Sequence, residues 1–415
     1  MKIVDVAEFY AEKGGGVRTY IHHKLRAAAA AGHEAVIIAP GPETRTEWRL
    51  GGRIEWIRSR PMPFDPRYHL LLNEKAVHAQ LDREQADVVE GSSPWTGGWM
   101  AARWRGRALK SFIFHQDPVA VYGHTLLARR LGYDRTDRLF NFYFQYLRRL
   151  SRHYDLTVTS GQWLADRLTE QRIAGATAVP FGVNKARFLT AKRDPELRCR
   201  LLHACDAQAD TPLLVAVSRH HPEKRLLSLL DGFAQAKRQQ PLALAIYGDG
   251  PLRGLVERKA RTVGNVHVAG FSADANHLAS VLASSDAFVH GSAAETFGIV
   301  IAEAMAAGLP LVVPNRGGAH ELADPSYAEC FEPGDPTAFA SAVVRLLARD
   351  LPAMGRLSRR AAQRQVVDMD QHFRLLFHEY EARLGRLETA VSKVAVGRKP
   401  TATRPAPMQS PIPAA

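Results

Sequence analysis

The segment from Gly291 to Gly308 places two carboxylates around the start of a predicted helix. Glu295 lies in the loop after a predicted strand, Ala287–His290, and Glu303 lies eight residues further on, inside the helix. A helix N-terminus presents free N–H groups and partial positive charge, which favour an anion. Because helical side chains tilt toward the N-terminus, Glu303 leans back toward that end. The segment therefore predicts a ligand with a polyol at each end and a diphosphate between them, the layout of a nucleotide-diphosphate sugar.

Further motifs that could hold such a ligand follow other predicted strands. They are Val217-Ser218-Arg219 with Pro222-Glu223-Lys224-Arg225, Tyr247-Gly248-Asp249-Gly250-Pro251, Val268-Ala269-Gly270-Phe271, Gly14-Gly15-Gly16-Val17 and Pro180-Phe181-Gly182-Val183-Asn184. Together with the E-x7-E spacing of Glu295 and Glu303, these motifs in this order resemble the retaining glycosyltransferases of family 4. The resemblance extends to about Tyr380 and is more specific in the C-terminal half.

The resemblance implies a role for each motif. Arg219 and Lys224 would clamp the donor diphosphate, Glu295 would bind a hydroxyl of the transferred sugar, and Glu303 would bind the ribose. The implied catalytic residues are His115, Arg219, Lys224 and Glu295. The implied donor-binding residues are Gly15, Gly16, Arg219, Lys224, Gly248, Gly270, Phe271, Glu295, Phe297, Gly298, Ile299 and Glu303.

The chain departs from the family pattern at four positions. Ser218, Arg225, Gly291 and His320 stand where the family often has Gly, Gly, Pro and Pro. None of these departures removes a charged group on which the motifs depend. The four departures therefore bear more on which substrate the protein uses than on whether it has the activity.

Predicted strands and helices alternate in both halves of the chain, which indicates two parallel, doubly wound sheets. The resemblance implies that this is the GT-B architecture, an α/β fold with two Rossmann-like domains that face each other across a cleft. We predict an acceptor-side domain at 1–184, an interdomain connection at 185–211, a nucleotide-sugar domain at 212–366, a helix that crosses back at 367–390 and a disordered basic tail at 391–415. The predicted strands are Ile3–Val6, Ala35–Ala39, Ile54–Ile57, Asp87–Glu90, Ser111–Phe114, Leu156–Thr159, Thr177–Val179, Leu213–Val217, Ala243–Tyr247, Val266–Ala269, Ala287–His290, Leu311–Val313 and Ala328–Phe331.

Two features of the N-terminal half lie at the carboxyl edge of its predicted sheet, where ligands bind in such folds. Gly14, Gly15 and Gly16 form a strand-to-helix turn, which is either a plain tight turn or a loop that touches the donor or the acceptor. His115 follows the strand Ser111–Phe114, and the resemblance makes it a sugar contact. Trp95 and Trp99 either line the acceptor side of the cleft or pack ordinarily.

Composition limits the class of protein. A chain of 415 residues with 46% hydrophobic residues can form two domains, and no apolar run approaches the roughly 18 residues that span a bilayer. The chain enters a strand at once, and its three cysteines have no C-x-x-C spacing, so we expect a cytoplasmic protein without disulfides.

The net charge of +13 fits nucleic acid, an anionic membrane, an anionic substrate or simply an arginine-rich proteome. Residues 103–152 carry eleven Lys and Arg against three Asp and Glu, with aromatic residues between them. This segment could lie on anionic lipid, which would make the protein peripheral at the inner face of the cell membrane. Most of its aromatic residues should still face the core. No recognition-helix module is visible, so we expect no nucleic acid partner.

Transfer from a nucleotide sugar leaves growing charge on the departing diphosphate, and fixed cations are the largest means of stabilising it. Arg219 offers a planar fork and Lys224 a point charge. These cations would replace a metal ion, and no His/Cys cluster has ligand spacing, so we expect neither metal nor cofactor. By analogy with the family, the acceptor attacks the same face that the phosphate leaves, and no protein nucleophile is needed.

The leading hypothesis is transfer of a hexosyl group from a UDP- or GDP-sugar to a membrane glycolipid or a lipid-linked saccharide. A soluble sugar or sugar-phosphate acceptor is the alternative within the same chemistry. A nucleotide-sugar 2-epimerase shares the architecture but needs no acceptor. A non-catalytic partner subunit would keep the fold, but the intact Arg219, Lys224, Glu295 and Glu303 argue against it.

Overall fold

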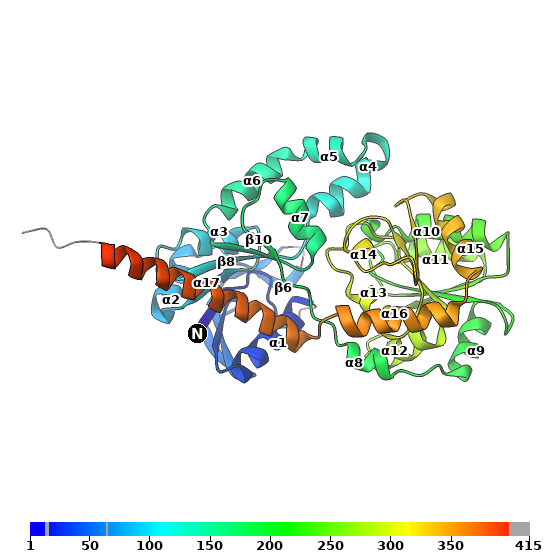
Figure 1. Cartoon of the computed structure of the whole chain (residues 1–415), viewed down its shortest axis with the longest axis horizontal. Coiled ribbons are helices and arrows are strands. Elements are labelled where there is room, and N and C mark those ends of the chain that lie inside the picture. The colour runs from blue at the N-terminus through cyan, green and yellow to red at the C-terminus, as the bar shows by residue number, and fades with distance from the viewer. Residues whose placement is uncertain (13–15, 64, 398–415) are drawn as a thin grey trace, which may run out of the picture.

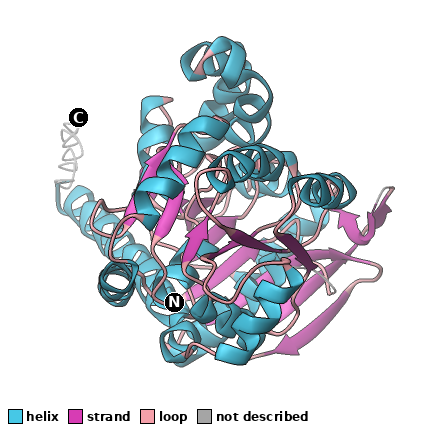
Figure 2. Ribbon diagram, turned by 90° about the vertical axis from the view of Figure 1, so that its right-hand side faces the viewer, coloured by secondary structure: helices cyan, strands magenta, loops and turns pink. Residues whose placement is uncertain are grey.

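The computed structural model describes residues 1–12, 16–63 and 65–397 of the chain, with side chains through Arg386. Figure 1 shows two α/β domains, the N-terminal domain at the left and the C-terminal domain at the right. Viewed from the C-terminal side, the strands lie between helices (Figure 2). The predicted pair of doubly wound domains is therefore present.

The N-terminal domain contains a sheet that has, within the described residues, eight strands in the order β10-β9-β8-β7-β1-β2-β4-β3. All neighbours pair in parallel except β3 with β4. The strands are β1 (Lys2–Val6), β2 (Glu34–Gly41), β3 (Arg45–Arg49), β4 (Gly52–Arg58), β7 (Val88–Gly91), β8 (Leu109–Phe114), β9 (Leu156–Thr159) and β10 (Ala176–Ala178). The strand order reverses between β1 and β7, which creates a crevice at the carboxyl ends.

Helices cover both faces of this sheet because successive strand residues point to opposite sides. Ile3 and Ile37 join one buried cluster, whereas Val4 and Val36 join another on the opposite face. The helices are α1 (Gly16–Ala30), α2 (Glu74–Glu84), α3 (Thr96–Arg103), the π-helix η1 (Val119–His124), α4 (Thr125–Leu131), α5 (Tyr133–Leu139), α6 (Asn141–Ser151) and α7 (Gln162–Glu170). A separate hairpin of β5 (Arg60–Met62) and β6 (Asp65–Leu70) was not predicted, nor was β3.

The C-terminal domain has a parallel sheet whose described strands follow the order β13-β12-β11-β14-β15-β16. These strands are β11 (Leu213–Val217), β12 (Ala243–Tyr247), β13 (Val266–Gly270), β14 (Ala287–Val289), β15 (Leu311–Pro314) and β16 (Ala328–Phe331). The helices are the 3-10 turn η2 (Pro222–Lys224), α10 (Leu226–Lys237), α11 (Arg253–Val263), α12 (Ala275–Ser284), α13 (Ile299–Ala306), α14 (Gly318–Glu321), α15 (Pro336–Leu347) and α16 (Leu351–Gln365). The strand order reverses between β11 and β14.

The segment predicted as a connection, residues 185–211, differs from the expectation. It forms α8 (Lys185–Thr190) and α9 (Pro195–Ala204), which pack on the C-terminal domain. Phe188 and Leu201 are buried in the core of that domain. Because α8 and α9 are short and mostly charged, their few apolar residues give no clear amphipathic pattern in the sequence. Since these residues pack into the core of the C-terminal domain, the segment is part of that domain rather than a linker.

Helix α17 (Met369–Gly397) returns to the N-terminal domain and lies along it in Figure 1. The Tyr380 hydroxyl donates to Glu90 Oε1 at 2.6 Å, and Tyr20 and His372 pair at 3.0 Å. The helix continues past residue 390, so residues 391–397 of the expected tail are helical, and 398–415 lie outside the described residues. None of the described helices has the length and apolar character needed to cross a membrane.

Candidate active site

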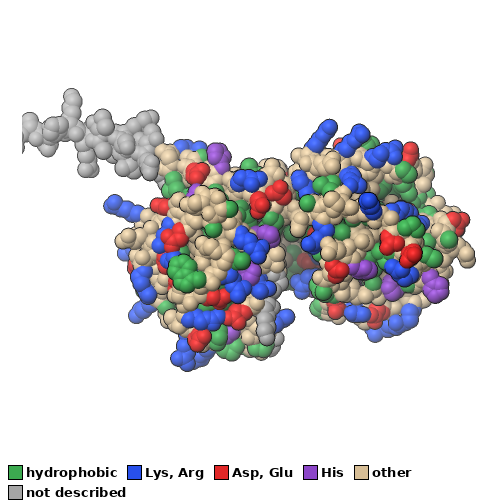
Figure 3. All heavy atoms as spheres, turned by 90° about the horizontal axis from the view of Figure 1, so that it is seen from below, with side chains coloured by type: hydrophobic (Ala, Val, Ile, Leu, Met, Phe, Trp, Pro, Cys, Tyr) green, Lys and Arg blue, Asp and Glu red, His purple; other side chains and the backbone are tan. Residues whose placement is uncertain are grey.

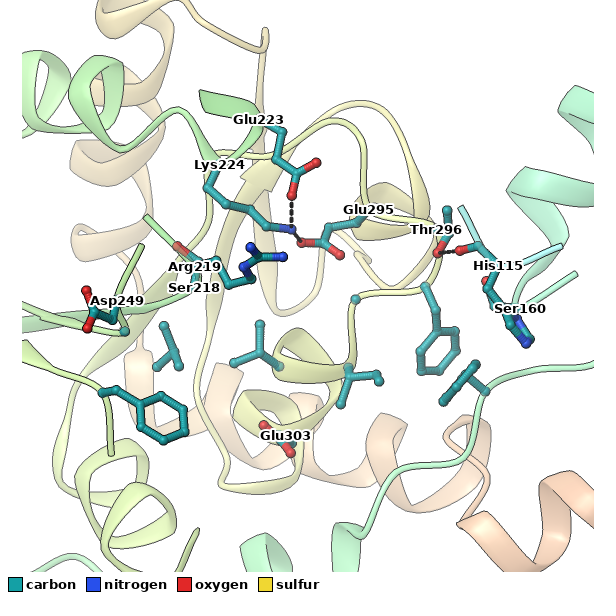
Figure 4. Close-up of a pocket in the computed structure, with 18 residues that line it drawn as sticks. His115, Ser160, Ser218, Arg219, Glu223, Lys224, Asp249, Glu295, Thr296 and Glu303 are labelled. Carbon is teal, nitrogen blue, oxygen red and sulfur yellow. Dashed lines mark hydrogen bonds and ion pairs between the residues drawn. The ribbon is translucent and has the colours of Figure 1, made fainter. Parts of the chain in front are cut away.

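A cavity of about 620 Å³ lies at the carboxyl edge of the C-terminal sheet and is closed on one side by the N-terminal domain. The deep indentation between the two lobes is visible in Figure 3, and Figure 4 shows the lining side chains. The lining residues are His115, Ser160, Phe181, Val217, Ser218, Arg219, Glu223, Lys224, Gly248, Asp249, Phe271, Glu295, Thr296, Phe297, Gly298, Ile299, Val300 and Glu303.

The fold brings two loops together at this cavity. The loop after β11 carries Lys224 and the loop after β14 carries Glu295, and these strands flank the reversal of strand order, where ligands bind in such sheets. A Cβ atom at Gly291 would lie 2.6 Å from the Lys224 carbonyl oxygen. Glycine at 291 therefore permits the close approach of the two loops.

Glu295 and Lys224 form an ion pair at the centre of the cavity. Lys224 Nζ lies 2.5 Å from Glu295 Oε1 and 3.5 Å from Glu223 Oε1, and His290 Nε2 lies 3.1 Å from Glu295 Oε1. Burial raises the pKa of Glu295, but Lys224 and His290 outweigh it and hold the pKa well below its usual range. Burial lowers the pKa of Lys224, and the two carboxylates reverse this so that the pKa is raised. Both groups are therefore charged at neutral pH.

Arg219 is exposed at the mouth of the site, and the described residues offer it no ion-pair partner. Figure 4 shows its guanidinium group beside the Lys224–Glu295 pair. An unpaired planar fork can accept a phosphate without first giving up a carboxylate. Arg219 and Lys224 thus present two positive charges to the same side of the cavity.

The N-terminus of α13 lies against the same cavity. Its first residue is Ile299, and Gly298 precedes it with a φ of +90°, a conformation that favours glycine. No side chain caps this helix end. Ile301 and Ala302 donate to the Gly298 carbonyl, so the N–H groups of Ile299 and Val300 are the ones available to an anion.

Glu303 lies below the Lys224–Glu295 pair in Figure 4, on the other side of Arg219 from that pair. It lacks a hydrogen-bond partner among the described residues, and burial raises its pKa to about 7, which Arg187 opposes only weakly. Even a half-buried carboxylate without donors is costly when charged. Two hydroxyl groups of a ribose would supply the missing donors.

His115 lines the cavity from the N-terminal domain. Both of its ring nitrogens are covered and lack a hydrogen-bond partner among the described residues, and the rings of Tyr20 and Phe181 lie at 5.3 Å. Burial lowers the pKa of His115 to about 3. The imidazole is therefore neutral at physiological pH and suits hydrogen bonding rather than proton release. Its backbone carbonyl accepts from Thr296 Oγ1 at 2.8 Å, across the cleft.

Two glycines shape the opposite wall. Gly248 has a φ of +132°, and a Cβ atom there would overlap the Ser218 carbonyl oxygen. Gly270 accepts from the Gly248 N–H at 2.8 Å and lies behind the wall rather than in it. Phe271, whose side chain is 75% exposed, lines the cavity beside Gly248.

The fold brings most of the predicted site residues together, and their roles remain predictions. Gly16 begins α1 outside the cavity lining, and Gly15 lies outside the described residues. The sequence argument missed Ser160 and Thr296. Ser160 directly follows the predicted strand Leu156–Thr159, so its position at a carboxyl edge was a usable signal. Thr296 donates a hydrogen bond to the His115 carbonyl of the other domain, and no local sequence pattern predicts a contact between domains.

The described residues contain no group of three or more His, Cys, Asp or Glu side chains arranged to hold a metal ion. The cavity instead offers the two cations, the helix terminus and the two glutamates. This set of groups can bind a diphosphate that carries hydroxyl-bearing rings on both sides.

Comparison with known proteins agrees with this chemistry. Residues 14–187 match the model for Glycosyltransferase Family 4, and residues 211–349 match the model for Glycosyl transferases group 1. A GDP-mannose-dependent alpha-mannosyltransferase of Mycobacterium tuberculosis is 30% identical over 332 residues, which cover 78% of this chain and 82% of that protein. A GDP-mannose-dependent alpha-(1-6)-phosphatidylinositol dimannoside mannosyltransferase of the same species is 27% identical over 365 residues, which cover 88% of this chain and 92% of that protein.

A solved structure of sucrose-phosphate synthase from Thermosynechococcus elongatus has a TM-score of 0.70 at 20% identity and covers 93% of this chain and 100% of that chain. This likeness shows the GT-B fold, with two Rossmann-like domains. The fold, the matched family models and the identity to the mannosyltransferase together establish that this chain is a glycosyltransferase of family 4.

Proposed function

We propose that the protein transfers a mannosyl group, with retention of configuration, from GDP-mannose to a hydroxyl of a membrane glycolipid or lipid-linked saccharide. The observation that carries the proposal is the cavity in which Arg219 and Lys224 lie between two glutamates. The cations suit a diphosphate, Glu295 suits the sugar and Glu303 suits the ribose.

In the proposed reaction the bond between the anomeric carbon and the phosphate oxygen breaks as the acceptor hydroxyl forms a new bond on the same face. Arg219, Lys224 and the α13 N-terminus stabilise the charge that develops on the leaving diphosphate. The acceptor proton passes to an oxygen of that diphosphate. Glu295 stays ionised beside Lys224 and orients a sugar hydroxyl, so it need not act as a nucleophile.

Transfer should need no added metal ion, because two side-chain cations already face the diphosphate. The expected result is an unchanged rate after incubation with a chelator and dialysis. A rate that falls with the chelator and returns with Mg²⁺ or Mn²⁺ contradicts this part of the proposal.

GDP-mannose is the proposed donor because the names of several relatives state dependence on it. The direct experiment incubates the protein with a panel of GDP- and UDP-sugars and follows released nucleotide. We expect release from GDP-mannose above all others. Lys224→Ala serves as the control for contaminating activity.

A membrane acceptor is supported by an exposed apolar and basic surface on the N-terminal domain. Helices α4 to α6 project at the top of Figure 1 and leave Leu126 70% and Phe142 67% exposed. Arginines 129, 130, 135 and 138 are exposed beside them. Apolar side chains among cations suit an anionic lipid surface, so we place the protein at the cytoplasmic face of a membrane.

The second candidate is the same transfer to a soluble sugar or sugar phosphate. Trp95, 45% exposed, follows β7 at the crevice of the N-terminal sheet and could stack on either kind of acceptor sugar, whereas Trp99 donates to the Tyr146 hydroxyl at 2.9 Å and is packed. Label from the donor that stays in the aqueous phase as a larger saccharide would favour the soluble acceptor. Conversion of the donor sugar in the absence of any acceptor would identify an epimerase.

A further inference from the structure

Arg225 adopts a backbone conformation that its side chain does not favour. Its φ is +52° and its ψ is +30°, in the left-handed region where residues with a Cβ atom are strained. It directly follows Lys224 of the ion pair and precedes α10. Glycine would adopt this conformation without strain, so the contacts that the arginine side chain makes are of interest.

The Arg225 side chain leaves its own domain and reaches the N-terminal domain. Its Nη2 atom lies 3.4 Å from the backbone carbonyl oxygen of His124. The guanidinium group also lies close to Gly334, where a Cβ atom would be 2.5 Å from Nη1. Burial raises the pKa of Tyr133, and the Arg225 charge beside that hydroxyl acts against this rise. The contact therefore joins the donor loop to the segment that carries His124 and Tyr133.

A second arginine of the C-terminal domain contacts the same segment. The guanidinium of Arg316, which follows β15, lies 3.9 Å from the centre of the Tyr133 ring, a close cation–π contact. Residues 119–139, which form η1, α4 and α5, are called the arm below. Arg225 and Arg316 hold the arm from two separate loops.

Within the N-terminal domain, the arm is tied to the loop that carries His115. His124 Nε2 lies 2.7 Å from Asp137 Oδ1, and Arg167 contacts both Asp137, at 2.9 Å, and Asp117. Asp117 lies two residues after His115 and accepts from the Val119 N–H at 2.8 Å. An unbroken series of polar contacts thus runs from the loop of Lys224 to the loop of His115.

We propose that Arg225 and Arg316 are positioning residues that fasten the arm to the C-terminal domain and so hold His115 opposite Glu295 for sugar transfer. Neither arginine needs to touch the substrate. The inference concerns the transferase reaction and does not depend on which sugar or acceptor is used. Glycine at 225 would preserve the backbone conformation of the loop but would remove the side-chain contact with His124 of the arm.

The test compares Arg225→Gly with the wild-type protein. Glycine adopts the left-handed conformation without strain, so the substitution should not lower the unfolding temperature through the backbone. We expect kcat to fall about 10- to 100-fold, since small errors in the placement of reacting groups are costly. The dissociation constant of the nucleoside diphosphate should change less than about threefold, because Arg219, Lys224 and Glu303 remain. Small-angle scattering of the nucleotide complex should give a larger radius of gyration.

Arg172→Gly is the matched control. Arg172 is exposed, has a φ of +58° and lies outside the interdomain contacts, so the substitution makes the same chemical and backbone change without touching the arm. It should leave kcat and the radius of gyration unchanged. Arg316→Ala should lower kcat and raise the radius of gyration, but by less than Arg225→Gly does. In the double variant, the loss in the logarithm of kcat should not exceed the sum of the losses in the two single variants.

Two results would overturn the proposal. One is a kcat and a radius of gyration for Arg225→Gly that equal those of Arg172→Gly. The other is a nucleotide affinity that falls as much as kcat/KM, which would make Arg225 part of the diphosphate site itself. Because scattering and nucleotide binding need no turnover, a protein inactive with GDP-mannose would refute the donor assignment while leaving this test intact.

Discussion

At the scale of single residues, a few charged groups that line the cavity decide what it can bind. Lys224 and Glu295 neutralise one another, Arg219 has no ion-pair partner among the described residues, and Glu303 is half-buried without a donor there. A diphosphate sugar would supply an anion to the two cations and hydroxyl donors to the two glutamates. The residue-scale predictions follow from this mismatch between the groups present and the partners available.

Removal of any one of the three charged groups at the diphosphate and sugar should slow turnover strongly. Arg219→Ala, Lys224→Ala and Glu295→Ala should each reduce kcat by about 10²- to 10³-fold, since each removes a preorganised charge or its partner. Steady-state kinetics with saturating acceptor measures the effect. Arg200→Ala, which breaks an exposed pair with Glu196 outside the cavity lining, is the control and should be near wild type. Near-wild-type rates for Arg219→Ala and Lys224→Ala would contradict the diphosphate assignment.

Donor binding should depend on pH through Glu303. Burial raises the pKa of Glu303 to about 7, so the free side chain is protonated below that pH and charged above it. Ribose hydroxyls donate hydrogen bonds best to the carboxylate, so affinity for GDP should weaken as pH falls from 8 to 6. Calorimetric titration measures this change. Glu303→Gln should remove the part of the dependence that is not due to the phosphates of GDP, and an unaltered pH profile in that variant would refute the assignment.

At the scale of elements, strands were the most predictable feature. Runs such as Leu213–Val217 and Ala243–Tyr247 are buried on both faces and appear as continuous apolar stretches. The strand β3 (Arg45–Arg49) was missed because its charged side chains do not alternate with apolar ones, and its partner β4 in the structure explains its formation. Helices α8 and α9 were missed as part of the C-terminal domain because few of their residues are apolar.

The site was predictable wherever a residue follows a strand and was less so where two domains meet. Glu295 and Lys224 follow β14 and β11 in the same sheet, so local patterns indicate that both lie at one edge of it, as they do in the structure. The contacts of Thr296 with His115 and of Arg225 with the arm depend on how the domains face one another. No spacing in the sequence encodes that relation directly.

Helix α17 should stabilise the N-terminal domain through one buried hydroxyl. Tyr380 donates to Glu90 at 2.6 Å and contacts Ser111 Oγ at 3.2 Å. Tyr380→Phe should cost about 1–2 kcal/mol in the free energy of unfolding, because it leaves a buried carboxylate oxygen without its donor. Urea unfolding followed by tryptophan fluorescence measures the change. Tyr143→Phe is the control, since the buried Tyr143 hydroxyl lacks a partner among the described residues, and equal losses in both variants would contradict the assigned contact.

At the scale of the whole molecule, two features bear on the acceptor. The cavity lies between domains, and the surface of helices α4 to α6 carries exposed apolar residues among arginines. The aromatic residues of α6 divide as expected, because Phe144 is buried in the core while Phe142 remains outside. If the protein docks on a membrane through this surface, as proposed, a membrane-bound acceptor would reach the cleft from the side of helices α4 to α6.

Binding to vesicles should depend on this surface. Leu126→Ser combined with Phe142→Ser should reduce sedimentation with vesicles of an anionic phospholipid several-fold, since both apolar contacts with the lipid are lost. Vesicles of a zwitterionic phospholipid should bind the wild-type protein weakly. Leu255→Ser combined with Leu357→Ser, at exposed positions of the C-terminal domain, is the control. Equal binding by both double variants would exclude helices α4 to α6 as the docking surface.

The most direct test of the central claim is transfer of labelled mannose from GDP-mannose to membrane lipid. The purified protein is incubated with the labelled donor and a total lipid extract, and the organic phase is analysed for label and for the configuration of the new bond. We predict label in a glycolipid, an α-linkage like that of the donor, and loss of both in Lys224→Ala. A β-linked product, or no transfer from GDP-mannose to lipid while another donor is turned over, would contradict it.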